Sequence, residues 1–193
     1  MLHNLGQVLR ARGGVYDAWR AKTFLEEALA VRSKDIGDQH PSVIDTRTVL
    51  ARVFRCQGEH AKAADELKSA SQAMDGIRRS DTLGFGPAGS PDLSSKYECA
   101  VLIAEGELRF ALGNRADAKQ SFERAQGLAQ ELARQGVPPP SVEHAELLEN
   151  LGRVYNAESP SFGEHLLERA AASREALDKA RAGAPKIPEE VDR

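Results

Sequence analysis

Small and apolar residues recur along the chain in stripes spaced three to five residues apart, as in helices that bury one face. Gly58 is followed by two alanines with a leucine between them, and Gly113 is followed at the same spacing by two alanines with a phenylalanine. The matched positions are Ala63, Leu67 and Ala70, and Ala118, Phe122 and Ala125. The shared spacing indicates a repeated unit of two helices joined by a short turn.

The stripes, together with the Gly and Pro positions, predict the bounds of the helices. We expect helices over residues 1–12, 17–34, 42–57, 60–79, 92–112, 115–135, 141–157 and 162–182. Residues 80–91 are rich in Gly and Pro and predict a loop, while residues 183–193 predict a flexible tail.

Each unit closes on an alanine, and these alanines divide the chain into four parts. They are Ala28, Ala70, Ala125 and Ala170. The expected units cover about 1–41, 42–91, 92–140 and 141–182, and together form one repeat domain over 1–182. A helical pair of this size cannot bury its apolar stripe alone, so the units must stack on one another. The predicted fold class is an all-α solenoid of about four helix-turn-helix repeats.

Three segments resemble the tetratricopeptide repeat family, and within it the kinesin-light-chain type. These are residues 24–32, the linker Gly37-Asp38-Gln39-His40-Pro41-Ser42-Val43, and residues 50–70. The resemblance implies a right-handed solenoid that is not an enzyme and binds a protein partner. In this family the first helix of each unit lines a concave groove that receives a peptide or a partner helix.

Carried over position by position, the resemblance implies a set of groove residues. The candidates for peptide binding are Asn4, Gln7, Arg10, Arg52, Arg55, Asn150 and Arg153. The first two groove helices carry an excess of four positive charges and the last two an excess of four negative ones. Arginine in the basic half would suit an acidic peptide, because its planar guanidinium pairs with carboxylates. The alternative is that these charges form weak ion pairs on solvated helix faces.

The third unit departs from the pattern of the others. It has Glu105 and Arg109 where the second unit has Leu50 and Phe54. We therefore expect its first helix to lie in a shifted register.

Composition and charge narrow the function further. The net charge is −3 with 28% charged residues, which predicts no nucleic-acid partner. The longest apolar run, residues 99–104, is far shorter than a membrane span, so no membrane partner is expected. Two cysteines cannot form a disulfide framework, which favours a cytoplasmic location. Cys56 and His60 flank the turn at Gly58 without forming a catalytic or metal set, so neither a cofactor nor a metal is expected.

A second function stays open at this point. The first apolar stripe begins at Leu2 with no preceding cap. Residues 1–12 could therefore stack on another copy or another protein, making the chain a structural or regulatory segment of a larger assembly.

Overall fold

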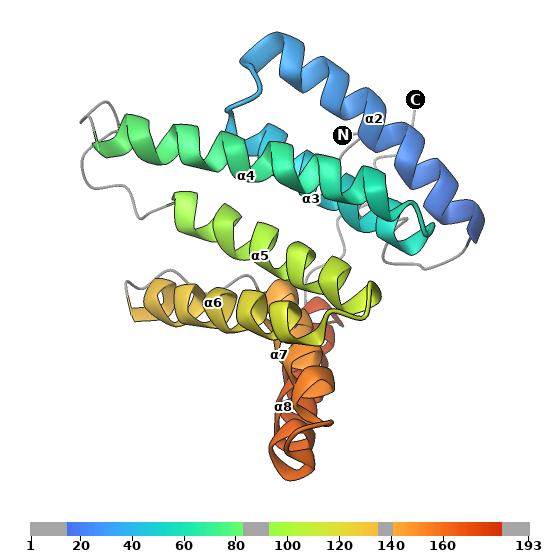
Figure 1. Cartoon of the computed structure of the whole chain (residues 1–193), viewed down its shortest axis with the longest axis vertical. Helices are drawn as coiled ribbons and strands as arrows, with labels where there is room; N and C mark the ends of the chain where they lie inside the picture. Colours follow the sequence, from blue (N-terminus) through green and yellow to red (C-terminus); the bar gives the residue numbers. More distant parts are fainter. Residues whose placement is uncertain (1–14, 83–92, 135–140, 183–193) are drawn as a thin grey trace. The chain divides into compact units, whose positions relative to one another are not determined.

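A computed structural model describes residues 15–82, 93–134 and 141–182, and all its regular elements are helices (Figure 1). They are α2 (Val15–Ile36), α3 (Pro41–Cys56), α4 (His60–Thr82), α5 (Leu93–Ala111), α6 (Arg115–Arg134), α7 (Ser141–Tyr155) and α8 (Pro160–Ala182). The all-α prediction is confirmed, and these bounds lie within three residues of the expected ones. The first three residues of the predicted 80–91 loop belong to α4. The expected helix over 1–12 and the tail over 183–193 lie outside the described residues.

The chain divides into two compact bodies, Met1–Pro139 and Pro140–Arg193. In the first body α3 pairs with α4, and α5 pairs with α6, each across a three-residue turn. Helix α2 packs on α3, while α5 packs on both α3 and α4 (Figure 1). The second body contains the pair α7 and α8. The division into four units stays a prediction.

The turns after α3 and α5 share one backbone geometry. Gly58 has φ +77° and Gly113 has φ +82°, a left-handed conformation that favours glycine. In both turns the next amide reaches back to the helix: Glu59 N donates to Phe54 O, and Asn114 N donates to Arg109 O, each at 2.9 Å. Because these bonds satisfy carbonyls at the helix ends, the glycines fix where each second helix begins.

Small residues allow the two helices of a pair to approach closely. Ala63 and Ala118 are fully buried at the matched positions. At Gly106 an added Cβ would lie 2.7 Å from Phe122 Cδ1, and at Gly152 one would lie 2.7 Å from Leu167 Cγ. Helix α5, at Gly106, and helix α7, at Gly152, therefore each place a glycine against the second helix of their pair. The prediction of a shifted register in α5 is wrong, because Gly106 retains its packing place despite the polar residues beside it.

The linker before α3 is held by its own motif residues. His40 caps the helix, its Nδ1 accepting a hydrogen bond from Ser42 N at 3.1 Å, and Pro41 follows in the first turn. Asp38 accepts a hydrogen bond from Arg47 Nη2 at 2.9 Å. Hydrogen bonds from Ser33 and from Arg47 hold the pKa of Asp38 below its usual range. The carboxylate thus ties the linker to α3.

Candidate interaction site

Two of the predicted groove arginines meet a glutamate between α3 and α5. Arg52 Nε lies 3.4 Å from Glu107 Oε2, and Arg55 Nη2 donates to the same oxygen at 3.3 Å. Arg52 and Arg55 are three residues apart, so they lie on one face of α3. Two guanidinium groups thus share one carboxylate oxygen.

The three side chains of this cluster, Arg52, Arg55 and Glu107, differ in their accessibility to a ligand. The side chain of Arg52 is 5% exposed and that of Glu107 is 8% exposed, whereas that of Arg55 is 26% exposed. Thr48, one turn before Arg52, is also buried. Of the two arginines that the sequence predicts for the groove on α3, Arg52 is therefore buried, together with Thr48, and Arg55 is accessible. Ion pairs with a carboxylate in so little water are stronger than surface pairs but carry a desolvation cost.

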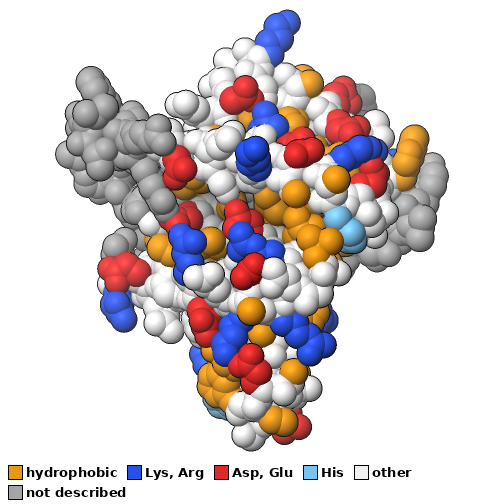
Figure 2. Space-filling view, in the orientation of Figure 1, with side chains coloured by type: hydrophobic (Ala, Val, Ile, Leu, Met, Phe, Trp, Pro, Cys, Tyr) orange, Lys and Arg blue, Asp and Glu red, His pale blue; other side chains and the backbone are white. Residues whose placement is uncertain are grey.

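The predicted separation of charge along the groove is reduced by pairing within the chain. Arg47 contacts Glu66 at 2.8 Å in addition to Asp38, so all three arginines of α3 have carboxylate neighbours. Figure 2 shows the same interleaving over the face that it displays, where acidic and basic side chains alternate. One acidic residue of α5 thus offsets part of the positive charge of α3 across the helix interface.

The other predicted site residues lie in the second body or outside the described residues. Arg153 pairs with Glu149 one turn before it, and Glu149 also contacts Arg174 of α8. Asn150 is half-buried on α7 beside Glu149. Burial, with a contribution from the charge of Arg169, lowers the pKa of His144 at the start of α7. Asn4, Gln7 and Arg10 fall in the part of the chain that the structure does not describe.

Part of the chain matches a known protein family. The family model for the tetratricopeptide repeat matches residues 1–75. The first 75 residues of the chain thus resemble tetratricopeptide repeats. No curated protein matches it in sequence.

Among solved structures the chain is similar to BtubC (BKLC) from P. vanneervenii, with a TM-score of 0.58 at 20% identity. The likeness covers 98% of this chain and 69% of that one, so the similarity in fold extends beyond the residues of the family model. Two structures of a putative kinesin light chain with TPR-like repeats from Podosopora anserina are also similar. Their TM-scores are 0.38 and 0.37 at 17% and 16% identity, covering 92% and 91% of this chain and 96% of each of those.

Comparison of the turns at Gly58 and Gly113 identifies two polar residues that the sequence analysis assigns to no site. Glu105 and Arg109 stand eight and four residues before Gly113, as Leu50 and Phe54 stand before Gly58. Their side chains are ordered by neighbouring helices: Ser71 of α4 donates to Glu105, and Arg109 contacts Ser121 of α6. The signal was present in the sequence as two polar residues in an apolar register. From the sequence alone we attribute these residues to a shifted register, whereas in the structure both line a hollow between α4 and α5.

The described helices show few features of other function classes. No group of three or more His, Cys, Asp and Glu side chains that could hold a metal occurs among the described residues. Cys56 is exposed, Cys99 is buried, and neither forms a disulfide. None of the described helices is long and apolar enough to span a bilayer.

Proposed function

We propose that this chain is a non-catalytic adaptor that binds an acidic peptide or partner helix along the concave face of its tetratricopeptide repeats. The observation that carries this proposal is the cluster of Arg52 and Arg55 around a single carboxylate oxygen of Glu107. Tetratricopeptide repeats generally mediate protein–protein contacts, which supports the class of function.

Arg55 is the residue through which an acidic partner would be bound. Its side chain is partly exposed, and both Arg55 and its neighbour Arg52 lie close to the same carboxylate oxygen of Glu107 on α5. A carboxylate arriving from a partner would pair with the exposed guanidinium while Glu107 holds the buried part of the cluster in place. Asn4, Gln7 and Arg10 in the first unit, and Asn150 with Arg153 in the second body, remain candidate contacts to the backbone and side chains of the partner.

A binding assay with defined peptides tests the proposal. Fluorescence anisotropy would compare acidic peptides with the same sequences carrying Gln and Asn in place of Glu and Asp. We expect Arg55→Gln to weaken binding of the acidic peptides by about tenfold, the worth of one charge-assisted hydrogen bond. The matched control is Arg134→Gln, because Arg134 is exposed on α6 and away from the cluster. Affinity capture from lysate with the same variants would then identify the natural partner.

The outcomes separate this function from its alternative. Equal binding of acidic and neutral peptides, or an unchanged affinity in Arg55→Gln, would remove the groove proposal. If capture of a partner instead depends on Leu2 and Leu5, the chain acts as a structural or regulatory segment through residues 1–12.

A further inference from the structure

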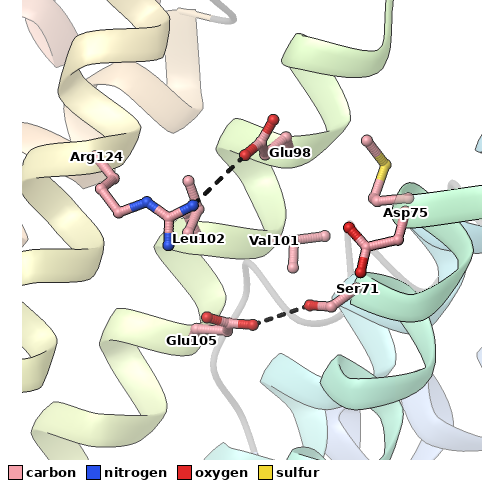
Figure 3. A pocket seen from close by; sticks show the side chains of 8 residues that line it. Ser71, Asp75, Glu98, Val101, Leu102, Glu105 and Arg124 are labelled. Carbon is pink, nitrogen blue, oxygen red and sulfur yellow. Dashed lines mark hydrogen bonds and ion pairs between the residues drawn. The ribbon is translucent and has the colours of Figure 1, made fainter. Parts of the chain in front are cut away.

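The face of α5 that is turned away from α3 is hollowed between α4 and α6. Although α5 packs on both of these helices, α4 and α6 do not pack on each other within the described first body. A pocket of about 170 Å³ opens there, lined by α4, α5 and Arg124 of α6 (Figure 3). A second hollow of about 460 Å³ continues from it along α4 and α5, and the two share Ser71, Asp75 and Glu105.

The equivalent place in the preceding unit is closed. There Leu50 and Phe54 are buried, and Lys22 of α2 and Lys62 of α4 lie over the Phe54 ring at 5.2 and 5.6 Å from its centroid. Lys22 also contacts Glu59 at 3.4 Å, which links α2 to the turn before α4. The junction around α3 is therefore sealed by an aromatic ring with cations on it.

The hollow at α5 follows from the residues that replace this apolar pair. Glu105 Oε1 accepts a hydrogen bond from Ser71 Oγ at 3.0 Å, and its Oε2 lies 3.3 Å from Arg109 Nη2. Partly burying a carboxylate costs free energy that a leucine would not cost. A local break in an otherwise consistent pattern is characteristic of functional positions.

The smaller pocket has an excess of negative charge. Three carboxylates line it, those of Asp75, Glu98 and Glu105, against one guanidinium. Arg124 lies 3.9 Å from Glu98 and its side chain is 63% exposed, so this pair is weak and Arg124 can move aside. In Figure 3 Arg124 lies at the left of the pocket and Ser71 and Asp75 at the right, with Glu98 and Glu105 of α5 between them.

Apolar side chains line part of both hollows, and Lys68, Gln72 and Arg109 also line the larger one. The buried side chains of Met74, Val101 and Leu102 also line the acidic pocket. The aliphatic part of a bound Arg or Lys side chain would therefore pack on these apolar groups while its charged end pairs with the carboxylates. The larger hollow reaches Leu67, Leu108 and Leu112, and Leu112 is 59% exposed. Figure 2 shows hydrophobic side chains gathered between α4 and α5.

We propose that this hollow binds a basic segment of a partner protein. One Arg or Lys side chain of the segment enters the acidic pocket, and a large apolar side chain beside it packs on Leu108 and Leu112. This site is separate from the cluster at Arg55. Glu105 and Glu107 are two residues apart on α5, which places them about 200° apart around the helix.

The test uses labelled helical peptides that carry one Leu and one Arg on the same face, one or two turns apart. The comparison peptides have Gln in place of Arg, or Ala in place of Leu. Binding is followed by fluorescence anisotropy, and the site is located by NMR chemical-shift changes. We expect the Leu–Arg peptide to bind, with shifts concentrated at Ser71, Glu105 and Leu108.

Three variants and a control define the expected result. Glu98→Gln and Glu105→Gln should each lower the affinity for the Leu–Arg peptide by about tenfold. Leu112→Ser should lower this affinity several-fold. Glu131→Gln on α6 is the control, since this exposed carboxylate lies outside the hollow. If Glu105→Gln perturbs the fold, Glu98→Gln and Leu112→Ser still test the proposal, because Glu98→Gln keeps the size of its side chain and Leu112 is 59% exposed.

Three results would overturn the proposal. One is equal affinity for the Gln peptide, and another is an unchanged affinity in all three variants. The third is concentration-dependent self-association that Leu112→Ser abolishes, because the occupant would then be a second copy of the chain. Arg55→Gln should leave the Leu–Arg peptide unaffected, so failure here is distinguishable from failure of the concave groove.

Discussion

Adding one methyl group at Gly106 tests whether α5 holds the register on which both candidate surfaces depend. In Gly106→Ala the new Cβ would lie 2.7 Å from Cδ1 and 2.8 Å from Cζ of Phe122. Phe122 is 1% exposed, so its ring has little room to retreat. Contacts between carbon atoms are normally about 3.5–4.0 Å, and the helices must therefore separate locally.

The size of the effect follows from two opposing contributions. Replacing glycine with alanine inside a helix stabilises it by about 1 kcal/mol. Overpacking of a dense core costs about 1–3 kcal/mol. The free energy of unfolding of Gly106→Ala should therefore fall by between about 0 and 2 kcal/mol.

Gly127→Ala is the matched control, because no atom lies within 4 Å of its added Cβ on α6. This variant should gain the full helix contribution of about 1 kcal/mol. The two variants should then differ by about 1–3 kcal/mol, or roughly 2–12 °C in melting temperature for a chain of this length. Thermal unfolding followed by circular dichroism measures this difference. Stabilisation of Gly106→Ala equal to that of Gly127→Ala would refute the register, whereas a partial recovery in Gly106→Ala/Phe122→Leu would localise the clash.

Three further predictions concern the turns, the closed junction and the second body. Gly58→Ala and Gly113→Ala should each lower the free energy of unfolding by about 1 kcal/mol, since their φ values are costly for alanine; chemical denaturation against Gly127→Ala checks this. Phe54→Ala should destabilise the first body by about 3–5 kcal/mol because it empties the sealed junction, and a loss below 1 kcal/mol would contradict the packing described. His144 has a lowered pKa in the folded state, so the unfolded chain takes up its proton first as the pH falls. The stability that His144 contributes is therefore present above its ordinary value of 6.5 and declines below it; His144→Gln should flatten this part of the pH profile of unfolding.

The helices could be predicted because their determinants are local. Gly58 and Gly113 set the ends of α3 and α5 through their own backbone geometry, and Pro41 starts α3 in the same way. The small residues at Ala63 and Ala118 show that a second helix packs there. None of these features requires knowledge of which units are neighbours.

The surfaces could not be predicted equally well, because they depend on contacts between units. The charges counted along the sequence predict an open groove with a basic first half and an acidic second half. In the structure Arg52 and Arg55 face Glu107 across more than fifty residues of sequence, so part of their charge is offset by this carboxylate. Burial of Arg52 likewise arises from the enclosure of α3, ten of whose sixteen residues are buried. The pattern of apolar and polar residues within α3 does not predict this burial, because it depends on the helices that pack around α3.

Helix α5 shows how one repeat unit can serve two surfaces without losing its packing. Gly106 keeps the pair of α5 and α6 closed, while the residues on either side of it carry carboxylates to opposite faces of the helix. Glu107 is used inside the protein, where it holds the arginines of α3. Glu105 stands where α3 has the buried Leu50. The apolar packing that closes the junction around α3 is therefore absent beside Glu105. The loss is local because the turn at Gly113 and the glycine contact to Phe122 do not involve the Glu105 side chain. A helical repeat can therefore exchange one apolar position between neighbouring helices for a polar one, and gain a pocket, while the packing within the helical pair is maintained by the face that remains unchanged.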